Sequence, residues 1–123
     1  MAKFKTREKR IISYIPIGYE DDEKPLTFKA RMLNARELAH FRDQSTRLDL
    51  ATNQMIIGSS EQEYEVARNC ILSWENMMID DLEVKCFLDT SGKFDETLVL
   101  EIPELFEIIC EVGRHIVIVS QES

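Results

Sequence analysis

The chain has 123 residues and a formal net charge of −8, with 44% hydrophobic and 31% charged residues. This length and balance indicate one soluble globular domain and exclude a disordered chain, while the acid excess disfavours nucleic acid and anionic membranes as partners. No apolar run approaches the roughly 20 residues of a membrane-spanning helix, and none follows the basic N-terminus as in a signal peptide, so we expect a cytoplasmic protein.

The first ten residues form a basic arm ahead of a single domain that spans residues 11–123. The arm has five basic side chains and one acid, a net charge of +4, so the remaining residues carry −12. Opposite charges on one chain favour head-to-tail association. We therefore expect the arm to contact an acidic surface of a neighbouring copy and the protein to be oligomeric. The basic residues of the arm are Lys3, Lys5, Arg7, Lys9 and Arg10.

Two strands are predicted at the start of the domain. The β-branched and aromatic run Ile11–Ile15 stops at Pro16, as a strand does. The segment Leu26–Met32 alternates apolar and polar side chains with a period of two, which is typical of a half-buried strand. Because only a short acidic turn separates them, we expect the two to pair as an antiparallel hairpin.

Two helices are predicted in the middle of the chain. The first, Asn34–Thr52, begins with an asparagine that can cap it and has Glu37 in the capping-box position. The second, Ser60–Met78, has apolar side chains at alternating spacings of three and four residues. Trp74 belongs to this second stripe, and we expect its side chain to be buried.

The last third of the chain combines short strands with a final helix. Val84–Leu88 and Leu98–Leu100 are predicted strands, and Asp89–Gly92 is a predicted turn between them. Pro103 suits the first position of a helix, Pro103–Ile116, whereas 117–119 fits either a helix end or a strand. The sequence therefore predicts an α+β fold, with about three helices on a small antiparallel sheet made of the N-terminal hairpin and short central strands.

No pattern of a catalytic or metal site occurs in the sequence. His40 and His115 have no second His or Cys at ligand spacing, and HExxH and GxSxG are absent. The three cysteines are odd in number and contain no CxxC pair, so we expect reduced thiols. We therefore expect a protein that is not an enzyme and that uses no cofactor and no metal.

Binding to a protein partner is the activity that remains. The edge of the hairpin can add a strand from a partner, and apolar helix faces can hold an amphipathic helix. Methionine suits adaptable contact surfaces, although it also fills cores. The candidate partner-binding residues are Met55, Ile56, Ile57, Met77 and Met78.

Three sequence features occur in the same order as in a known protein family. An Ile-Pro step precedes an alternating strand that ends in Leu-Asn-Ala-Arg-Glu-Leu, within Phe28–Leu38. A predicted helix then ends at Trp74 before an acidic turn, and a proline-initiated last helix ends in Ile-Val-x-Val-Ser. Together these features resemble the small tail assembly chaperones of tailed bacteriophages. The likeness covers residues 14–120 and lies in pattern, without a diagnostic motif.

The resemblance implies a non-enzymatic chaperone that works in the host cytoplasm during virion assembly. Such chaperones coat the long helical tape-measure protein, keep its apolar surface from aggregating and help to recruit tail-tube subunits. Two alternatives remain open: a structural virion subunit (tail, connector or baseplate component) that self-assembles, and an acidic inhibitor of a host nucleic-acid-binding protein. The chain departs from the family in its predicted strands, because the family is largely helical, and in its basic arm.

Overall fold

The computed structural model describes residues 1–3, 10–44, 47–49, 54–56 and 59–122, and within 42–56 the description covers the backbone alone. This part of the chain forms four helices, a three-stranded antiparallel sheet and two small hairpins, which confirms the predicted α+β class. The elements in chain order are β1 (Ile11–Tyr14), β2 (Thr27–Arg31), α1 (Ala35–Gln44), β3 (Arg47–Asp49), β4 (Gln54–Ile56), α2 (Ser60–Cys70), β5 (Ile71–Glu75), β6 (Met78–Ile79), β7 (Leu82–Glu83), α3 (Thr97–Glu101) and α4 (Pro103–Glu122).

The main sheet has the strand order β1-β2-β5, and both pairings are antiparallel. The predicted hairpin of the first two strands is confirmed. Tyr14 lies opposite Phe28, and Phe28 lies opposite Trp74, so these three aromatic side chains share one face of the sheet. Phe28 is fully buried, and Trp74 is only 8% exposed, so this face belongs to the hydrophobic core.

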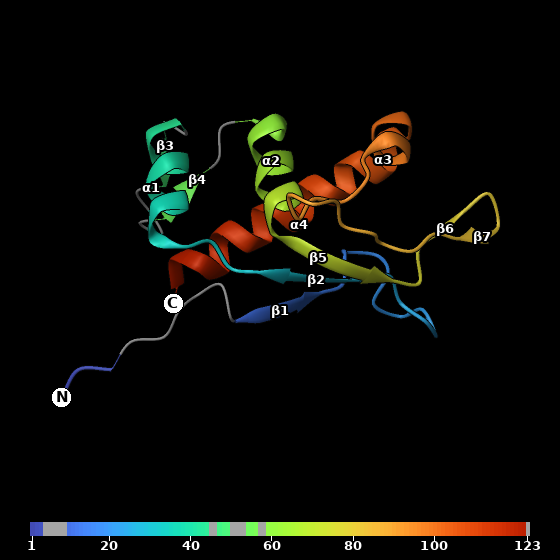
Figure 1. Ribbon diagram of the computed structural model, residues 1–123, viewed down its shortest axis with the longest axis horizontal. Coiled ribbons are helices and arrows are strands. Elements are labelled where there is room, and N and C mark those ends of the chain that lie inside the picture. Colours follow the sequence, from blue (N-terminus) through green and yellow to red (C-terminus); the bar gives the residue numbers. More distant parts are fainter. Residues whose placement is uncertain (4–9, 45–46, 50–53, 57–58, 123) are drawn as a thin grey trace.

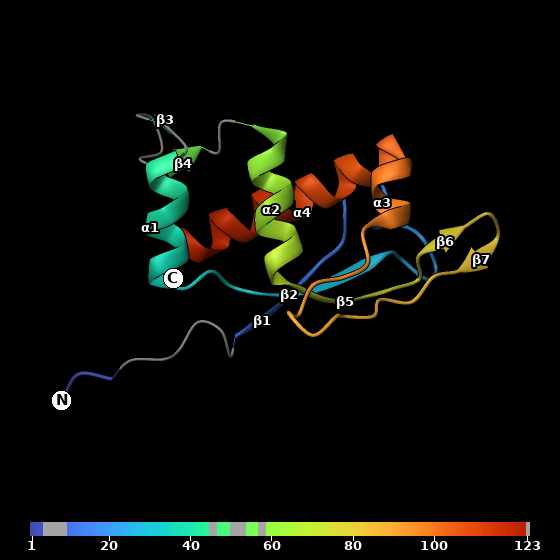
Figure 2. The same ribbon diagram turned by 45° about the horizontal axis from the view of Figure 1, so that its top comes forward.

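Helix α4 runs the length of the molecule, from α1 at one end to α3 at the other (Figures 1 and 2). Helix α2 crosses it so closely that the backbone of α2 lies directly against Gly113. Near its C-terminal end, α4 is tied to the segment after β2, where the Ser120 hydroxyl accepts a 3.0 Å hydrogen bond from the backbone N–H of Leu33. The core therefore lies where α2, α4 and the sheet meet.

The first predicted helix is correct at its start and wrong in its length. The Glu37 N–H donates to Asn34 Oδ1 at 2.9 Å, and Glu37 Oε1 accepts from the Asn34 N–H at 3.0 Å, which is the expected capping box. The helix ends at Gln44, and β3 and β4 follow as a hairpin instead. In Arg47–Asp49 apolar and polar residues alternate, and this strand period outweighs the weaker helical stripe. Residues 45–46 and 50–52 of this prediction lie outside the described residues.

The second predicted helix also ends early, because its last part is strand β5. The extended backbone begins at Ile71 (φ −65°, ψ 125°). Ala30 pairs with Ile71 while Lys29 pairs with Ser73, so β5 has one extra residue at this point and forms a bulge. The bulge lets Ile71 and Trp74, three residues apart, both face the core, and this is the spacing that imitates a helix. Burial of Trp74 is confirmed, although it lies on a strand.

The two short strands predicted after residue 83 are wrong. Val84–Leu88 belongs to no strand, apart from a single bridge between Leu88 and Phe94, and Leu98–Leu100 is part of helix α3. Asp95 Oδ1 accepts a 3.0 Å hydrogen bond from the Thr97 N–H, which favours a helical turn over a strand at this point.

The remaining C-terminal predictions are confirmed. The turn at Asp89–Gly92 closes with a 3.0 Å hydrogen bond from the Gly92 N–H to the Asp89 carbonyl. Pro103 is the first residue of α4, and Ile102 before it is extended (φ −112°, ψ 102°), as a residue before proline tends to be. The helix continues to Glu122, so the ambiguous segment 117–119 is helical.

Candidate functional site

After β5 the chain leaves the sheet and forms a short projecting hairpin. Asn76 has a left-handed backbone (φ 64°), and its side-chain amide donates a 2.9 Å hydrogen bond to the Pro25 carbonyl. Strands β6 and β7 are joined by Asp80–Asp81, whose positive φ values of 51° and 63° are those of a type I′ turn. Aspartate tolerates this conformation better than most side chains. The hairpin extends from one end of the molecule (Figures 1 and 2).

Two neighbouring hollows lie beside this hairpin, with Met77, Ile79 and Leu105 lining both. Their volumes are about 610 and 400 Å³. We call the two hollows together the hairpin groove. The other apolar residues of the first hollow are Leu26, Met78, Ile102 and Ile108, and those of the second are Trp74, Leu82, Val84, Phe87, Leu98 and Val99.

Several large apolar side chains at the groove remain open to solvent. Leu82 is 71% exposed, Phe87 74% and Leu98 41%, and all three line the second hollow. Met78, at 59% exposure, lines the first. Single exposed apolar residues are ordinary, but several that converge on one hollow are typical of an interaction surface.

The floor of the groove is held in place by the core. Trp74 Nε1 donates a 2.9 Å hydrogen bond to the Val84 carbonyl, and the Val84 N–H donates one of 2.8 Å to the Met77 carbonyl. The Trp74 ring also packs edge-on against Phe94, with centroids 5.5 Å apart. The segment after the hairpin is therefore fixed against β5, and the exposed side chains project from a rigid base.

The rim of the groove is acidic. The two hollows are lined by five carboxylates and two lysines, and the segment Glu75–Glu111 as a whole has eleven acids and two lysines. Such a surface attracts ligands of positive charge. The carboxylates of the rim are Asp22, Asp80, Glu83, Asp95 and Glu104, and the lysines are Lys24 and Lys85.

The sequence-predicted partner-binding residues are not all brought together. Met77 and Met78 lie at the groove, but they follow strand β5 and do not end a helix. Met77 is only 4% exposed and belongs to the core, whereas Met78 is accessible. Met55 and Ile56 are in β4, where only the backbone is described, and Ile57 lies outside the described residues.

Sequence reasoning missed the three most telling side chains of the groove. Leu82 lies in no predicted helix or strand, and Phe87 and Leu98 lie in the predicted strands Val84–Leu88 and Leu98–Leu100. The available signal was their position: each lies within three residues of an acidic turn residue (Asp81, Asp89 or Asp95), where a buried strand does not readily begin or end. In the basic arm, Lys3 and Arg10 are exposed, whereas Lys5, Arg7 and Lys9 lie outside the described residues.

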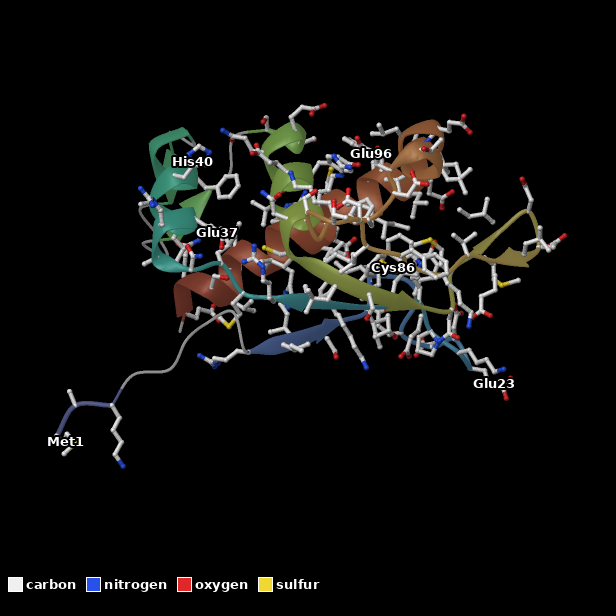
Figure 3. The ribbon with its side chains drawn as sticks, viewed as in Figure 1. Met1, Glu23, Glu37, His40, Cys86 and Glu96 are labelled. Atoms are coloured by element: carbon white, nitrogen blue, oxygen red, sulfur yellow. The ribbon has the colours of Figure 1, made fainter. Side chains whose placement is uncertain are left out.

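The two histidines lie apart from the groove. His40 is exposed on α1, with its ring 5.3 Å from that of Phe41 (Figure 3). His115 stacks on Tyr14 at a centroid distance of 4.3 Å, and burial lowers the pKa of this histidine. The Tyr14 hydroxyl donates a 2.5 Å hydrogen bond to Glu111; burial, followed by this bond, raises the pKa of the tyrosine. In the described part of the chain, no three His, Cys, Asp or Glu side chains are grouped to hold a metal ion.

The cysteines are free thiols that act as packing groups. Burial raises the pKa of Cys70 to about 12, and burial followed by the charge of Glu63 raises that of Cys110 to about 11. Both thiols are therefore protonated at neutral pH, which is the unreactive form. The Cys110 thiol donates to the Ser60 carbonyl at 3.3 Å, between α4 and the start of α2.

The helices of the described segments include none that is long and apolar enough to cross a membrane. Comparison with known proteins finds no matching family model, no matching curated protein and no matching solved structure.

Proposed function

We propose that the chain is a non-enzymatic tail assembly chaperone that binds an amphipathic helix of a long, tape-measure-like client in the hairpin groove. The observation that carries the proposal is the convergence of exposed Leu82, Phe87 and Leu98 on one hollow. Water contact with these side chains is unfavourable, and a client that covers them gains about 25 cal/mol for each Å² of apolar surface removed from water.

The groove suits an apolar helix face better than a small molecule. Its second hollow is lined by β5, the β6–β7 hairpin, the segment 84–87, α3 and α4, and three of its large apolar side chains remain exposed. A helix bound in such a groove inserts a few apolar anchors at spacings of three and four residues. Each anchor typically contributes about 1–3 kcal/mol.

The acidic rim adds a charge requirement. The five carboxylates of the groove favour a client whose apolar stripe is flanked by Lys or Arg. A long helix with basic flanks fits both the groove and the client class that the sequence resemblance implies. Since these contacts lie at the exposed rim, raised salt should slow association with the client.

The test uses two leucines of the same helix. Leu98 lines the groove at 41% exposure, whereas Leu100 lines neither hollow although it is 54% exposed. The protein is co-expressed with a long, tape-measure-like helical client, and the soluble, co-purifying fraction of that client is measured. We expect Leu98→Asp to weaken client binding about 10- to 100-fold, as the loss of one anchor implies, and Leu100→Asp to have little effect.

Two results would contradict the proposal. Equal effects of Leu98→Asp and Leu100→Asp would show that the groove is not the binding surface. A client that stays insoluble with or without the protein, together with rings or tubes formed by the protein alone, would favour the structural virion subunit instead. Circular dichroism and melting of each variant verify that the monomer fold is unchanged.

A further inference from the structure

Strand β1 forms one edge of the main sheet, and no strand of the described residues pairs with its free side. The strand order β1-β2-β5 leaves β1 at the outside of the sheet (Figures 1 and 2). At the opposite edge, the segment after β7 contacts β5: Val84 accepts from Trp74 Nε1, and the Cys86 thiol is 4.0 Å from the Leu72 carbonyl. Strand pairing with another chain is therefore available at β1.

Strand β1 contains none of the charged, proline or bulge devices that commonly protect isolated edges. It has the sequence Ile-Ile-Ser-Tyr, with no charge, no proline and no bulge, and Ile11 is 61% exposed. Natural proteins usually place a lysine, a proline or a bulge on an edge that must stay single. The one bulge of this sheet is on β5, at the other side.

We propose that β1 pairs with β1 of a second copy around a two-fold axis, to give a continuous antiparallel sheet of six strands. Residues that lie opposite each other in an antiparallel pair share one face of the sheet. The two-fold axis must therefore lie between the two copies of one residue, so that this residue is opposite itself. Within β1 only Ile12 and Ser13 are central enough for this position. Either position keeps Ile12 and Tyr14 of both copies on the core face.

Charge complementarity selects a second copy as the occupant. In this arrangement, residues that precede β1 in one copy lie beside residues that follow β1 in the other. The preceding residues are the arm with a net charge of +4, and the following residues include Glu20–Glu23, four consecutive exposed acids. This contact between arm and acidic turn forms twice, because a two-fold interface is isologous. This closed pairing replaces the open head-to-tail association expected from charge alone.

The acidic segment is positioned at the end of β1. The Tyr19 N–H donates a 3.1 Å hydrogen bond to the Pro16 carbonyl, which turns the chain. The side chain of Glu111 on α4 accepts from the Tyr14 hydroxyl and, at 2.9 Å, from the Ile17 N–H, which fixes this end of the strand to the core. Glu23 then points away from the body of the molecule (Figure 3). At full extension, the partner's arm advances about 3.3 Å per residue toward these acids.

The first experiment measures dimerisation of the intact chain by sedimentation equilibrium at low salt. We expect the monomer to tolerate Ser13→Glu, because Ser13 lies directly opposite Lys29 on β2. In the dimer it places two carboxylates on one face close to the axis, and we expect dimerisation at least about tenfold weaker. Thr90→Glu adds the same charge at an exposed turn far from β1 in sequence and should leave dimerisation unchanged.

The second experiment exchanges charges between the arm and the turn. Lys3→Glu with Arg10→Glu should weaken dimerisation about tenfold, and so should Asp21→Lys with Glu23→Lys. Combining all four changes should restore it, because the complementary signs are exchanged. Raised salt should weaken the wild-type dimer and leave little difference among these variants.

The outcomes are distinct from those of the client test. A monomeric wild type at low salt, or equal dimerisation of Ser13→Glu and Thr90→Glu, would overturn the proposal. If the variant with all four charge changes dimerises even more weakly than either double variant, the contact between arm and turn is refuted. Client binding by a monomeric Ser13→Glu variant should persist, since none of the groove residues belongs to β1.

Discussion

Gly113 at the crossing of α2 and α4 provides a stringent test of the fold. A Cβ atom at this position would lie 1.9 Å from the Glu63 carbonyl oxygen, 2.8 Å from its carbonyl carbon and 3.3 Å from the Ala67 nitrogen. Real Cβ atoms essentially never come closer than 3.0 Å to such neighbours, so in Gly113→Ala the helices must separate by about 1 Å. These atoms belong to the backbone of α2, which no rotamer change can move aside.

The cost can be estimated from two opposing effects. Overpacking a tight core costs about 1–3 kcal/mol, and a gap of this size forfeits a quarter to a half of the dispersion energy across the crossing. Alanine regains about 1 kcal/mol through its better helix propensity. Because the clash involves backbone, we place the cost at the upper end and expect the free energy of unfolding to fall by about 2 kcal/mol, which corresponds to a melting temperature lower by about 8 °C.

Urea unfolding followed by far-ultraviolet circular dichroism measures this change. Glu107→Ala, at an exposed position of the same helix, is the control and should alter stability by less than about 0.5 kcal/mol. A Gly113→Ala variant as stable as the wild type, or more stable, would mean that helix propensity outweighs the contact and that the two helices do not cross this closely.

Two further predictions concern the core and the pH dependence of stability. Trp74→Ala should lower the free energy of unfolding by about 3–5 kcal/mol in the same assay, because it removes a buried ring and leaves the Val84 carbonyl without its indole donor; a loss below about 1 kcal/mol would contradict the burial of this ring. Arg31 makes a bidentate contact with Glu37, at 2.8 and 2.9 Å, and this contact is the main cause that lowers the pKa of the Glu37 carboxyl below 4.5. The stability that the ion pair contributes is therefore complete above pH 4.5 and is lost as the pH falls through the lowered pKa. Glu37→Gln should therefore be less stable than the wild type at neutral pH, with a difference that shrinks in acid; a constant difference across this range would rule out the ion pair as its cause.

Local signals predicted those elements whose ends are set by neighbouring residues. Pro16 ends the first strand, the capping box of Asn34 begins α1, and Pro103 begins α4, and each of these depends on only a few adjacent residues. The length of the first helix could not be predicted as well, because no comparable stop signal marks Gln44.

Strand β5 could not be predicted because a bulge hides its period. Ile71 and Trp74 face the same side at a spacing of three residues, which a regular strand forbids and a helix allows. The distinction is made by pairing with β2, which lies more than forty residues earlier in the chain. Tertiary pairing therefore overrides a helical pattern that is locally convincing.

The groove was the hardest part to predict, because two of its exposed side chains, Phe87 and Leu98, fall in segments that the sequence predicts as strands. Leu82, Phe87 and Leu98 become a surface only because β6–β7 projects from the sheet and α3 takes the place of a predicted strand. Their exposure thus depends on two element changes that no short-range pattern reveals.

The buried position of Met77 determines which substitutions can test client binding. Met77 lines both hollows of the groove, yet it is only 4% exposed and packs in the hydrophobic core. A charge at Met77 would destabilise the domain and disturb the groove at the same time. A loss of client binding would then not distinguish unfolding from a lost contact. Leu98 is accessible and lies in the first turn of α3, where an acidic side chain suits the helix. Binding energy at the groove can therefore be removed through exposed side chains while the core that holds the groove in place stays intact.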